Sequence, residues 1–363
     1  MVGDPYFDLT ETRLRMFGGS SGHWGGACHP LEPQDFAPRP ARDGIGWPIG
    51  PEALDPHLAE ACEFLGIAPS FENIDFARDL RLTGFRFSTL RFGDAYRDLA
   101  ETAPNLRVCL HSAAVNLVPG GGGVRAAEIV SGLDGAGPRW RVEADLFVIC
   151  LGGIENSRLL LWANEQNNRA LIPNHDGIGR YWMEHPDALV GEALLFSDGR
   201  RLFERVERPG WRRGGELRFA LGAEYQRRAG VLNASLKIAE LAYGETQQVI
   251  ADLLCVAPAL GRQVMDAFAK KLVCGARVEC MWEQAPRAEN RVALGPERDR
   301  LGMPRVELHW RKDALDRRTA AGSARGLAAL LAENDLGRMR LIHWVAAKDS
   351  PIRVDPHQPA HHH

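Results

Sequence analysis

The sequence predicts a mixed fold, an α/β part followed by an α+β part built on an antiparallel sheet. The α/β part is indicated by Leu146–Leu151, a continuous apolar run leading into Gly152-Gly153 and a helical pattern. Such a run is typical of a strand buried on both faces of a parallel sheet. The α+β part is indicated by alternating apolar and polar residues in several short segments beyond residue 187. With 363 residues, 45% of them hydrophobic, the chain is long enough for two or three domains of roughly 150 residues each.

The first half begins with a glycine-dense loop, residues 17–26, and a proline-rich stretch from Pro30 to Pro51. Apolar residues at helical spacing then predict a helix over residues 51–65. Further along, short apolar runs flank a four-glycine turn at residues 120–123. They predict strands at 106–110, 113–118, 126–133 and 139–143.

The second half is predicted to form the antiparallel sheet, with helices at about 245–272 and 313–334 covering one of its faces. The candidate strands are Val190–Phe196, Leu217–Leu221, Val231–Ile238, Val278–Trp282, Arg291–Leu294 and Val306–Trp310.

Charge and cysteine content exclude several classes of protein. The net charge is −3, without the basic excess that a nucleic-acid partner requires. No run reaches the roughly 18 apolar residues of a spanning helix, and the first residues do not resemble a signal peptide. The seven cysteines are scattered and contain no CxxC, so we expect no metal site and a reducing, cytoplasmic compartment.

Two places have the features of a cofactor site. A strand, two glycines and a helix, residues 146–161, let backbone approach a ligand and offer the helix N-terminus to an anion. A tight strand-to-helix turn explains the same glycines equally well. The loop over residues 17–26 is the stronger signal, because His23 and Trp24 within it argue against a flexible linker. The chain contains no GxGxxG, the usual pyrophosphate fingerprint.

In order along the chain, the motifs resemble the glucose–methanol–choline (GMC) oxidoreductase family. The run Arg13–Gly26 (RLRMFGGSSGHWGG) resembles the flavin-facing segment, and GWPI follows at residues 46–49. Cys150–Leu160 (CLGGIENSRLL) looks like the second signature region, and Gly177–Pro186 (GIGRYWMEHP) is similar to the element after it. EQAP at 283–286, NRV at 290–292 and Asp299 resemble the substrate-domain strands.

The resemblance implies a partial FAD-binding, Rossmann-like domain joined to an antiparallel-sheet substrate domain. The FAD part would comprise residues 1–50 and 100–187, with 51–99 connecting, 188–345 binding substrate and 346–363 starting a closing segment. FAD is the implied cofactor, and an alcohol or sugar is the implied substrate, oxidised by hydride transfer to flavin N5. The implied cofactor contacts are Gly18, Gly19, Ser20, Ser21, His23, Trp24, Gly25, Gly26, Val115, Gly152, Gly153 and Glu155.

Two histidines carry roles that only the resemblance implies. His362 would be the catalytic base, although a truncated tag or a frayed tail would also account for the terminal histidines. His23 would lie near the flavin, either bonded covalently to its methyl group, hydrogen-bonded to it, or purely structural. The electron acceptor cannot be read from these residues.

The chain departs from the family at both ends, and this leaves alternatives open. It lacks the initial GxGxxG unit and the closing segment after His362, so we expect an internal fragment. Unpaired sheet edges would then invite a complementary chain or aggregation. The alternatives are an inactive fragment without FAD, one chain of a split enzyme, or a less favoured NAD-dependent dehydrogenase, which also needs the absent fingerprint.

Overall fold

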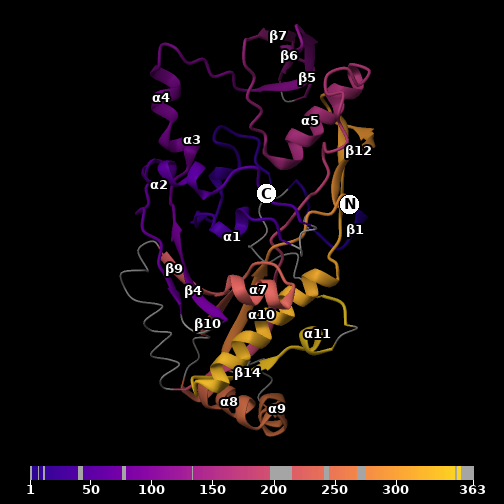
Figure 1. Ribbon diagram of the computed structural model, residues 1–363. Coiled ribbons are helices and arrows are strands. Elements are labelled where there is room, and N and C mark those ends of the chain that lie inside the picture. The colour runs from indigo at the N-terminus through magenta and orange to yellow at the C-terminus, as the bar shows by residue number, and fades with distance from the viewer. Residues whose placement is uncertain are drawn as a thin grey trace.

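The computed structural model describes most of the chain and contains three β-sheets with helices packed around them (Figure 1). The described residues are 2–6, 8–10, 13–39, 44–75, 79–132, 134–196, 215–240, 245–267, 275–347 and 350–352. This mixed architecture, with its antiparallel sheets, confirms the predicted fold class.

The largest sheet has eight strands, and all its pairings are antiparallel. Seven strands follow one path, and β3 (Asn73–Asp75) pairs with β4 outside it. The path runs through β14 (Gly337–Leu341), β8 (Asp187–Leu195), β11 (Ala276–Trp282), β10 (Ala234–Glu240), β9 (Gly215–Leu221), β4 (Leu80–Phe87) and β2 (Ala27–Cys28). Four of the predicted second-half strands therefore lie in this sheet.

The main core lies between this sheet and helix α10 (Ala314–Glu333), which crosses the sheet in Figure 1. Alternate residues of each strand, such as Leu236 and Val278, face the helix and are fully buried. The helix buries Leu327 and Leu331 against them. It begins in a capping box, in which Asp313 and Asp316 each accept a backbone N–H bond from the other's residue.

The predicted helix over 245–272 is divided. Helix α8 (Glu245–Val256) ends just before Pro258, and α9 (Pro258–Ala267) begins there, because proline cannot donate the helical backbone bond. Residues 268–272 lie outside the described residues. Both helices lie at the end of the molecule opposite β5–β7 (Figure 1). The short helices α7 (Ala223–Ala229) and α11 (His343–Ala346) complete this half.

The predicted strands Arg291–Leu294 and Val306–Trp310 form, but not in the large sheet. As β12 (Arg291–Arg298) and β13 (Pro304–Trp310), they make a separate sheet with β1 (Val2–Gly3), which pairs with β13 in parallel. The prediction that all strands of this half belong to one antiparallel sheet is therefore wrong for β12 and β13. Alternation shows that a strand has one buried face, but it does not identify the neighbouring strand.

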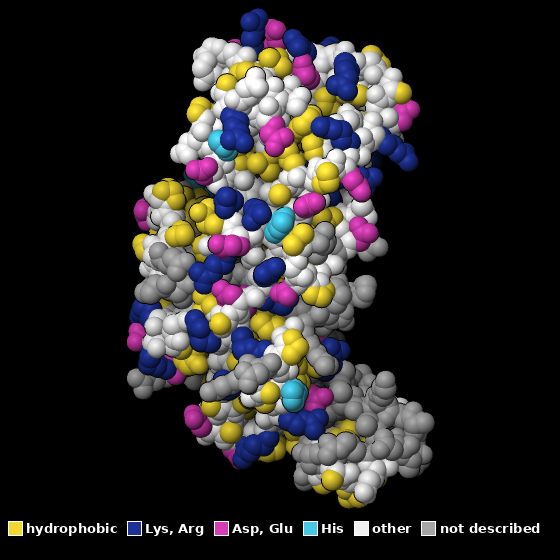
Figure 2. Space-filling model, turned by 90° about the vertical axis from the view of Figure 1, so that its right-hand side faces the viewer, with side chains coloured by type: hydrophobic (Ala, Val, Ile, Leu, Met, Phe, Trp, Pro, Cys, Tyr) yellow, Lys and Arg dark blue, Asp and Glu magenta, His cyan; other side chains and the backbone are white. Residues whose placement is uncertain are grey.

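A third sheet contains β5 (Ser112–Gly120), β6 (Gly123–Ser131) and β7 (Arg139–Glu143), as the flanking apolar runs predict. Helix α5 (Gly152–Gln166) packs against this sheet and shares a small core with it. The positive φ of Gly121 and Gly122 explains the glycine turn between β5 and β6. Hydrophobic side chains reach the surface over the end of the molecule that carries these strands (Figure 2).

Two predicted strands do not form. Among the described residues, neither 106–110 nor 146–150 pairs with another strand. Phe147 and Ile149 pack against the small core beside α5, whereas Leu146 and Val148 are 79% and 76% exposed. The expected strand is apolar on both faces, as the sequence shows. A strand also needs a neighbouring strand to accept and donate its backbone hydrogen bonds, and no described segment does so here.

Apart from strands β2, β3 and β4, the described part of residues 19–102 forms short turns and helices. The predicted helix over 51–65 becomes two 3₁₀ turns, Pro51–Ala53 and Asp55–His57, followed by α2 (Leu58–Leu65). The other short elements are η1 (Gly19–Gly22), α1 (Pro33–Phe36), α3 (Phe92–Ala95) and α4 (Arg97–Thr102). Residues 51–99 contribute β3 and β4 to the large sheet.

Candidate functional site

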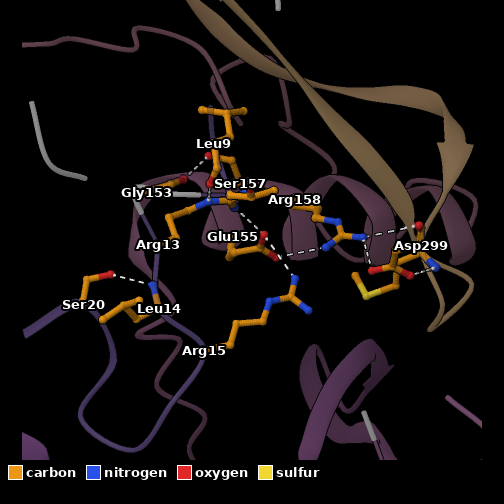
Figure 3. Close-up of polar contacts among 12 residues, drawn as sticks. Leu9, Arg13, Leu14, Arg15, Ser20, Gly153, Glu155, Ser157, Arg158 and Asp299 are labelled. Atoms are coloured by element: carbon orange, nitrogen blue, oxygen red, sulfur yellow. Dashed lines mark hydrogen bonds and ion pairs between the residues drawn. The ribbon is translucent and has the colours of Figure 1, made fainter. Parts of the chain in front are cut away.

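The two candidate cofactor segments lie side by side. Arg13, just before the glycine loop, donates from Nη1 to Glu155 Oε1 at 2.5 Å, although 142 residues separate the two. Arg15 Nη2 lies 3.5 Å from the same oxygen. Figure 3 shows both guanidiniums directed at Glu155, which projects from the first turn of α5. The sequence predicts both segments, and the fold joins them.

Glu155 belongs to a larger ion-pair network. Arg158, one helical turn further along α5, donates to Glu155 Oε2 at 3.2 Å and to Asp299 Oδ2 at 2.6 Å. Its Nε donates to the Pro304 carbonyl, and the residue is only 4% exposed. Burial opposes ionisation of Glu155, but the three guanidiniums outweigh burial and keep its pKa below the usual value. The carboxylate is therefore ionised and held in place near neutral pH.

The glycine loop is held by backbone contacts to residues 88–93. A Cβ on Gly18 would lie 2.3 Å from the Gly93 nitrogen, and one on Gly26 would lie 1.9 Å from the Ser88 oxygen. The Ser21 hydroxyl donates to the Gly18 carbonyl, and the Trp24 indole donates to the Leu90 carbonyl at 2.8 Å. The chain's own packing therefore requires Gly18 and Gly26, independently of any ligand.

Other glycines face open space. A Cβ on Gly19, Gly25 or Gly152 would meet no described atom within 4 Å. Gly19 and Gly152 have φ of +57° and +82°, which favours glycine on conformational grounds. Gly25 has no positive φ, so neither its backbone nor its packing requires glycine. An unexplained glycine with space beside it is expected where a ligand approaches the backbone closely.

The first turn of α5 is available to an anion. Its N-cap residue, Leu151, makes no side-chain capping bond, and the Leu151 N–H is bound by Asn156 Oδ1 at 2.8 Å. The following N–H groups have no capping side chain among the described residues, and a helix N-terminus favours negative charge. A Cβ on Gly153 would lie 3.2 Å from the Trp182 ring, so this glycine lets the tryptophan pack there. The open glycines and the uncapped helix leave room for an anionic cofactor to approach the backbone.

The remaining predicted site residues lie in different surroundings. Ser20 accepts a bond from the Leu14 N–H at 3.2 Å and so shapes the loop. His23 ends η1 and its backbone N–H donates to the Ser20 carbonyl. Val115 is 4% exposed, and its side chain belongs to the small core that β5, β6 and α5 share, not to the packing around the glycine loop. His362 lies outside the described residues.

Sequence reasoning gave no role to Arg13, Arg15 or Arg158. Only one signal could have revealed the network. Glu155 and Arg158 are three residues apart, so on a helix their side chains are neighbours. The partners Arg13 and Asp299 come from distant parts of the chain, and their contacts appear only in the fold.

Comparison with known proteins identifies oxidoreductases. The chain is 27% identical over 191 residues to the fructose dehydrogenase large subunit of Gluconobacter japonicus. This match covers 52% of the chain and 32% of that subunit, so the matched part spans about a third of the relative's length. No family model matches the chain.

Two solved structures are also similar. Pyridoxine 4-oxidase from Mesorbium loti matches 91% of this chain and 68% of its own, with 19% identity and a TM-score of 0.47. An Aspergillus oryzae formate oxidase variant matches 93% of this chain and 71% of its own, with 14% identity and a TM-score of 0.47. Within the described residues, no helix is both long and apolar enough to span a membrane.

Proposed function

We propose that the chain, whose motifs resemble those of the GMC oxidoreductases, carries the flavin-facing and substrate-facing parts of an FAD-dependent enzyme that oxidises a CH–OH group. The substrate class we propose is an alcohol or a sugar. The curated relative is named as a fructose dehydrogenase, which favours the sugar.

The observation that carries this proposal is the meeting of the glycine loop and the N-terminus of α5. The Arg13–Glu155 ion pair holds the two segments together, and open glycines belong to both. Gly25 is the most telling residue, because neither its φ nor any described neighbour requires glycine at this position of the loop. An alternative role as a simple strand-to-helix turn explains Gly152 but not Gly25.

The residues at the site have separate tasks. The N–H groups of the first turn of α5 would bind anionic oxygens of the cofactor, with the favourable field of the helix N-terminus. Backbone of the loop from Gly18 to Gly26 would approach the planar ring, where N–H donors stabilise developing negative charge. FAD, when bound, supplies the acceptor for the hydride. Arg13, Arg15 and Arg158 keep the Glu155 carboxylate charged and fixed.

The proton of the substrate hydroxyl requires a base, and we assign this role to His362 from the resemblance alone. A neutral imidazole titrates near physiological pH, so it accepts a proton efficiently when it lies within hydrogen-bonding distance. We place His23 beside the flavin, with covalent attachment as one of its two possible modes of contact.

The experiment is an absorption spectrum of the purified chain after incubation with FAD and removal of free cofactor, repeated after acid precipitation. We expect the flavin bands to remain with the native protein. Flavin in the acid pellet, lost in His23→Ala, would assign covalent attachment, and flavin in the supernatant would assign noncovalent binding. His175→Ala, which changes a partly exposed histidine outside the site, serves as the control. A chain without flavin in either state would contradict the proposal.

A further inference from the structure

The face of the large sheet opposite α10 is charged. In β10, Leu236 and Ile238 face the core, so Lys237 between them points to the other side. The register places Glu279 of β11 opposite Lys237, on the same face. From the neighbouring strand β9, Glu216 binds both Lys237 and Arg218, at 3.2 Å and 3.1 Å. We call these side chains, together with Asp187, the charged face.

Asp187 differs from its neighbours on this face. It is the first residue of β8 and pairs in register with Met281, two residues along β11 from Glu279. The residue is 8% exposed, and its Oδ1 has no hydrogen-bond partner among the described residues. The backbone N–H of Ala188 bonds the carboxylate, while the nearby cations Arg218 and Lys237 bind Glu216. One oxygen of a buried carboxylate therefore remains available, and such a group costs free energy unless a donor reaches it.

The chain connects the charged face to both candidate segments. The glycine loop continues into β2, and His29 just beyond it contacts Thr83, which pairs with Arg218 across β4 and β9. The Trp182 ring packs at Gly153 of α5, and Asp187 follows Trp182 by five residues along the chain. Both segments that we assign to the flavin therefore lead, within a few residues or one contact, to strands of the sheet that carries this face.

The mixture of positive and negative side chains on the charged face determines which class of ligand can bind there. A metal ion would be repelled by Arg218 and Lys237, and an anion by Asp187, Glu216 and Glu279. A neutral molecule with several hydroxyl groups satisfies both kinds of partner, because each hydroxyl donates to a carboxylate and accepts from a cation. A carboxylate is a strong acceptor for such donors.

We propose that Asp187 accepts a hydrogen bond from a hydroxyl group of a polyhydroxylated substrate, and that it thereby makes the site select a sugar over a simple alcohol. This inference rests on the proposed function for its reaction, but binding of the sugar can be measured without flavin. Asp187 is a specificity-determining residue in this account and takes no part in hydride or proton transfer.

The experiment compares binding of D-fructose and of 1-pentanol to the wild-type chain, Asp187→Asn and Asp187→Ala by calorimetry. We expect fructose affinity to fall about tenfold in Asp187→Asn and by about 10- to 100-fold in Asp187→Ala, the range for loss of a hydrogen bond to a charged group. Affinity for 1-pentanol should stay the same. Glu192→Gln is the control, because it removes a carboxylate of the same strand, β8, that is paired with Arg340 and lies outside the charged face. Its fructose affinity should change less than about threefold.

Thermal unfolding and flavin retention of the same variants separate the possible failures. Asp187→Asn should melt at or above the wild-type temperature, because it removes a buried unpaired charge. If wild-type chain holds no flavin but Asp187→Asn still weakens fructose binding, the proposed function fails and this inference stands. If flavin is retained but fructose binding is absent, unchanged in Asp187→Asn, or weakened together with 1-pentanol binding, this inference is overturned.

Discussion

Two apolar segments of this molecule have similar sequence patterns and different structures. Strand β11 lies between β8 and β10, and its core-facing residues Val278 and Cys280 are fully buried. Residues 146–150 pack Phe147 and Ile149 on a core, yet no described strand pairs with them and Val148 is 76% exposed. The difference shows that side-chain pattern determines which face of a strand is buried, whereas backbone partners determine whether the strand forms.

Amide hydrogen exchange gives the largest expected contrast between these segments. Backbone N–H groups of β11 are bonded to neighbours on both sides, so they should exchange only on opening of the sheet. Those of residues 145–150 donate to no described backbone group and should exchange at least about a thousandfold faster. Mass spectrometry of peptides from both segments makes the measurement. Equal protection would show that residues 145–150 are paired.

Two arginine–carboxylate pairs of equal length, 2.6 Å, allow a comparison between a buried and an exposed ion pair. Arg158→Ala removes a buried guanidinium and leaves Asp299, whose side chain is 20% exposed, without that partner, so we expect a loss of about 3 kcal/mol in the free energy of unfolding, the low end of the range for a buried pair. Arg141→Ala breaks an equally short pair with Glu128 whose arginine is 62% exposed, and should cost at most about 1 kcal/mol. Urea denaturation measures both. Similar losses of unfolding free energy would mean that burial of Arg158 does not increase the contribution of its ion pair to stability.

Truncation of apolar side chains compares the core of the large sheet with residues 146–150. Leu236→Ala in β10, at 0% exposure, should cost about 2–5 kcal/mol of unfolding free energy, because it leaves a cavity in the main core. Val148→Ala should change it by less than about 0.5 kcal/mol, since the side chain is already largely in water. Denaturant titration of both variants checks this. A cost above about 1 kcal/mol for Val148→Ala would contradict this and show that the Val148 side chain is buried in the folded protein.

Two carboxyl groups should give opposite pH dependences of stability. Burial, only partly offset by hydrogen bonds, raises the pKa of Asp316 in α10 to about 6. Its stabilising contribution is therefore present below about pH 3.8 and lost as the pH rises through 6. Glu155 has a pKa below its usual value, so its contribution is present above about pH 4.5 and lost on acidification.

Unfolding free energies measured between pH 3 and pH 7 distinguish the two groups. Asp316→Asn should remove part of the loss of stability between about pH 4 and pH 6, the rest coming from Asp187, whose pKa burial also raises to about 6. Glu155→Gln should remove part of the loss below about pH 4.5. Parallel pH profiles for wild type and both variants would contradict this assignment.

The sequence predicted most of what depends on a single segment. Local sequence patterns predict the alternation of apolar residues in β8, β9 and β11. They also predict the helical spacing of apolar residues in α10 and the glycines at the start of α5. Contacts between distant segments could not be predicted in this way. No local pattern predicts that the backbone of Gly93 packs against Gly18, or that Arg13 forms an ion pair with Glu155. Nor does any local pattern predict that β12 and β13 form a sheet separate from the large one. Such features depend on the register and packing of segments that meet only in the fold.

The central claim is that the glycine loop and the start of α5 hold a flavin nucleotide, and FAD affinity of two matched glycine variants tests it most directly. Gly25 and Gly123 both lack a positive φ and have space for a Cβ, but Gly123 lies in the hairpin strand β6. By quenching of flavin fluorescence, Gly25→Val should bind FAD at least about tenfold more weakly than wild type, with unchanged melting temperature, whereas Gly123→Val should bind it normally. Wild-type affinity in Gly25→Val would contradict the account.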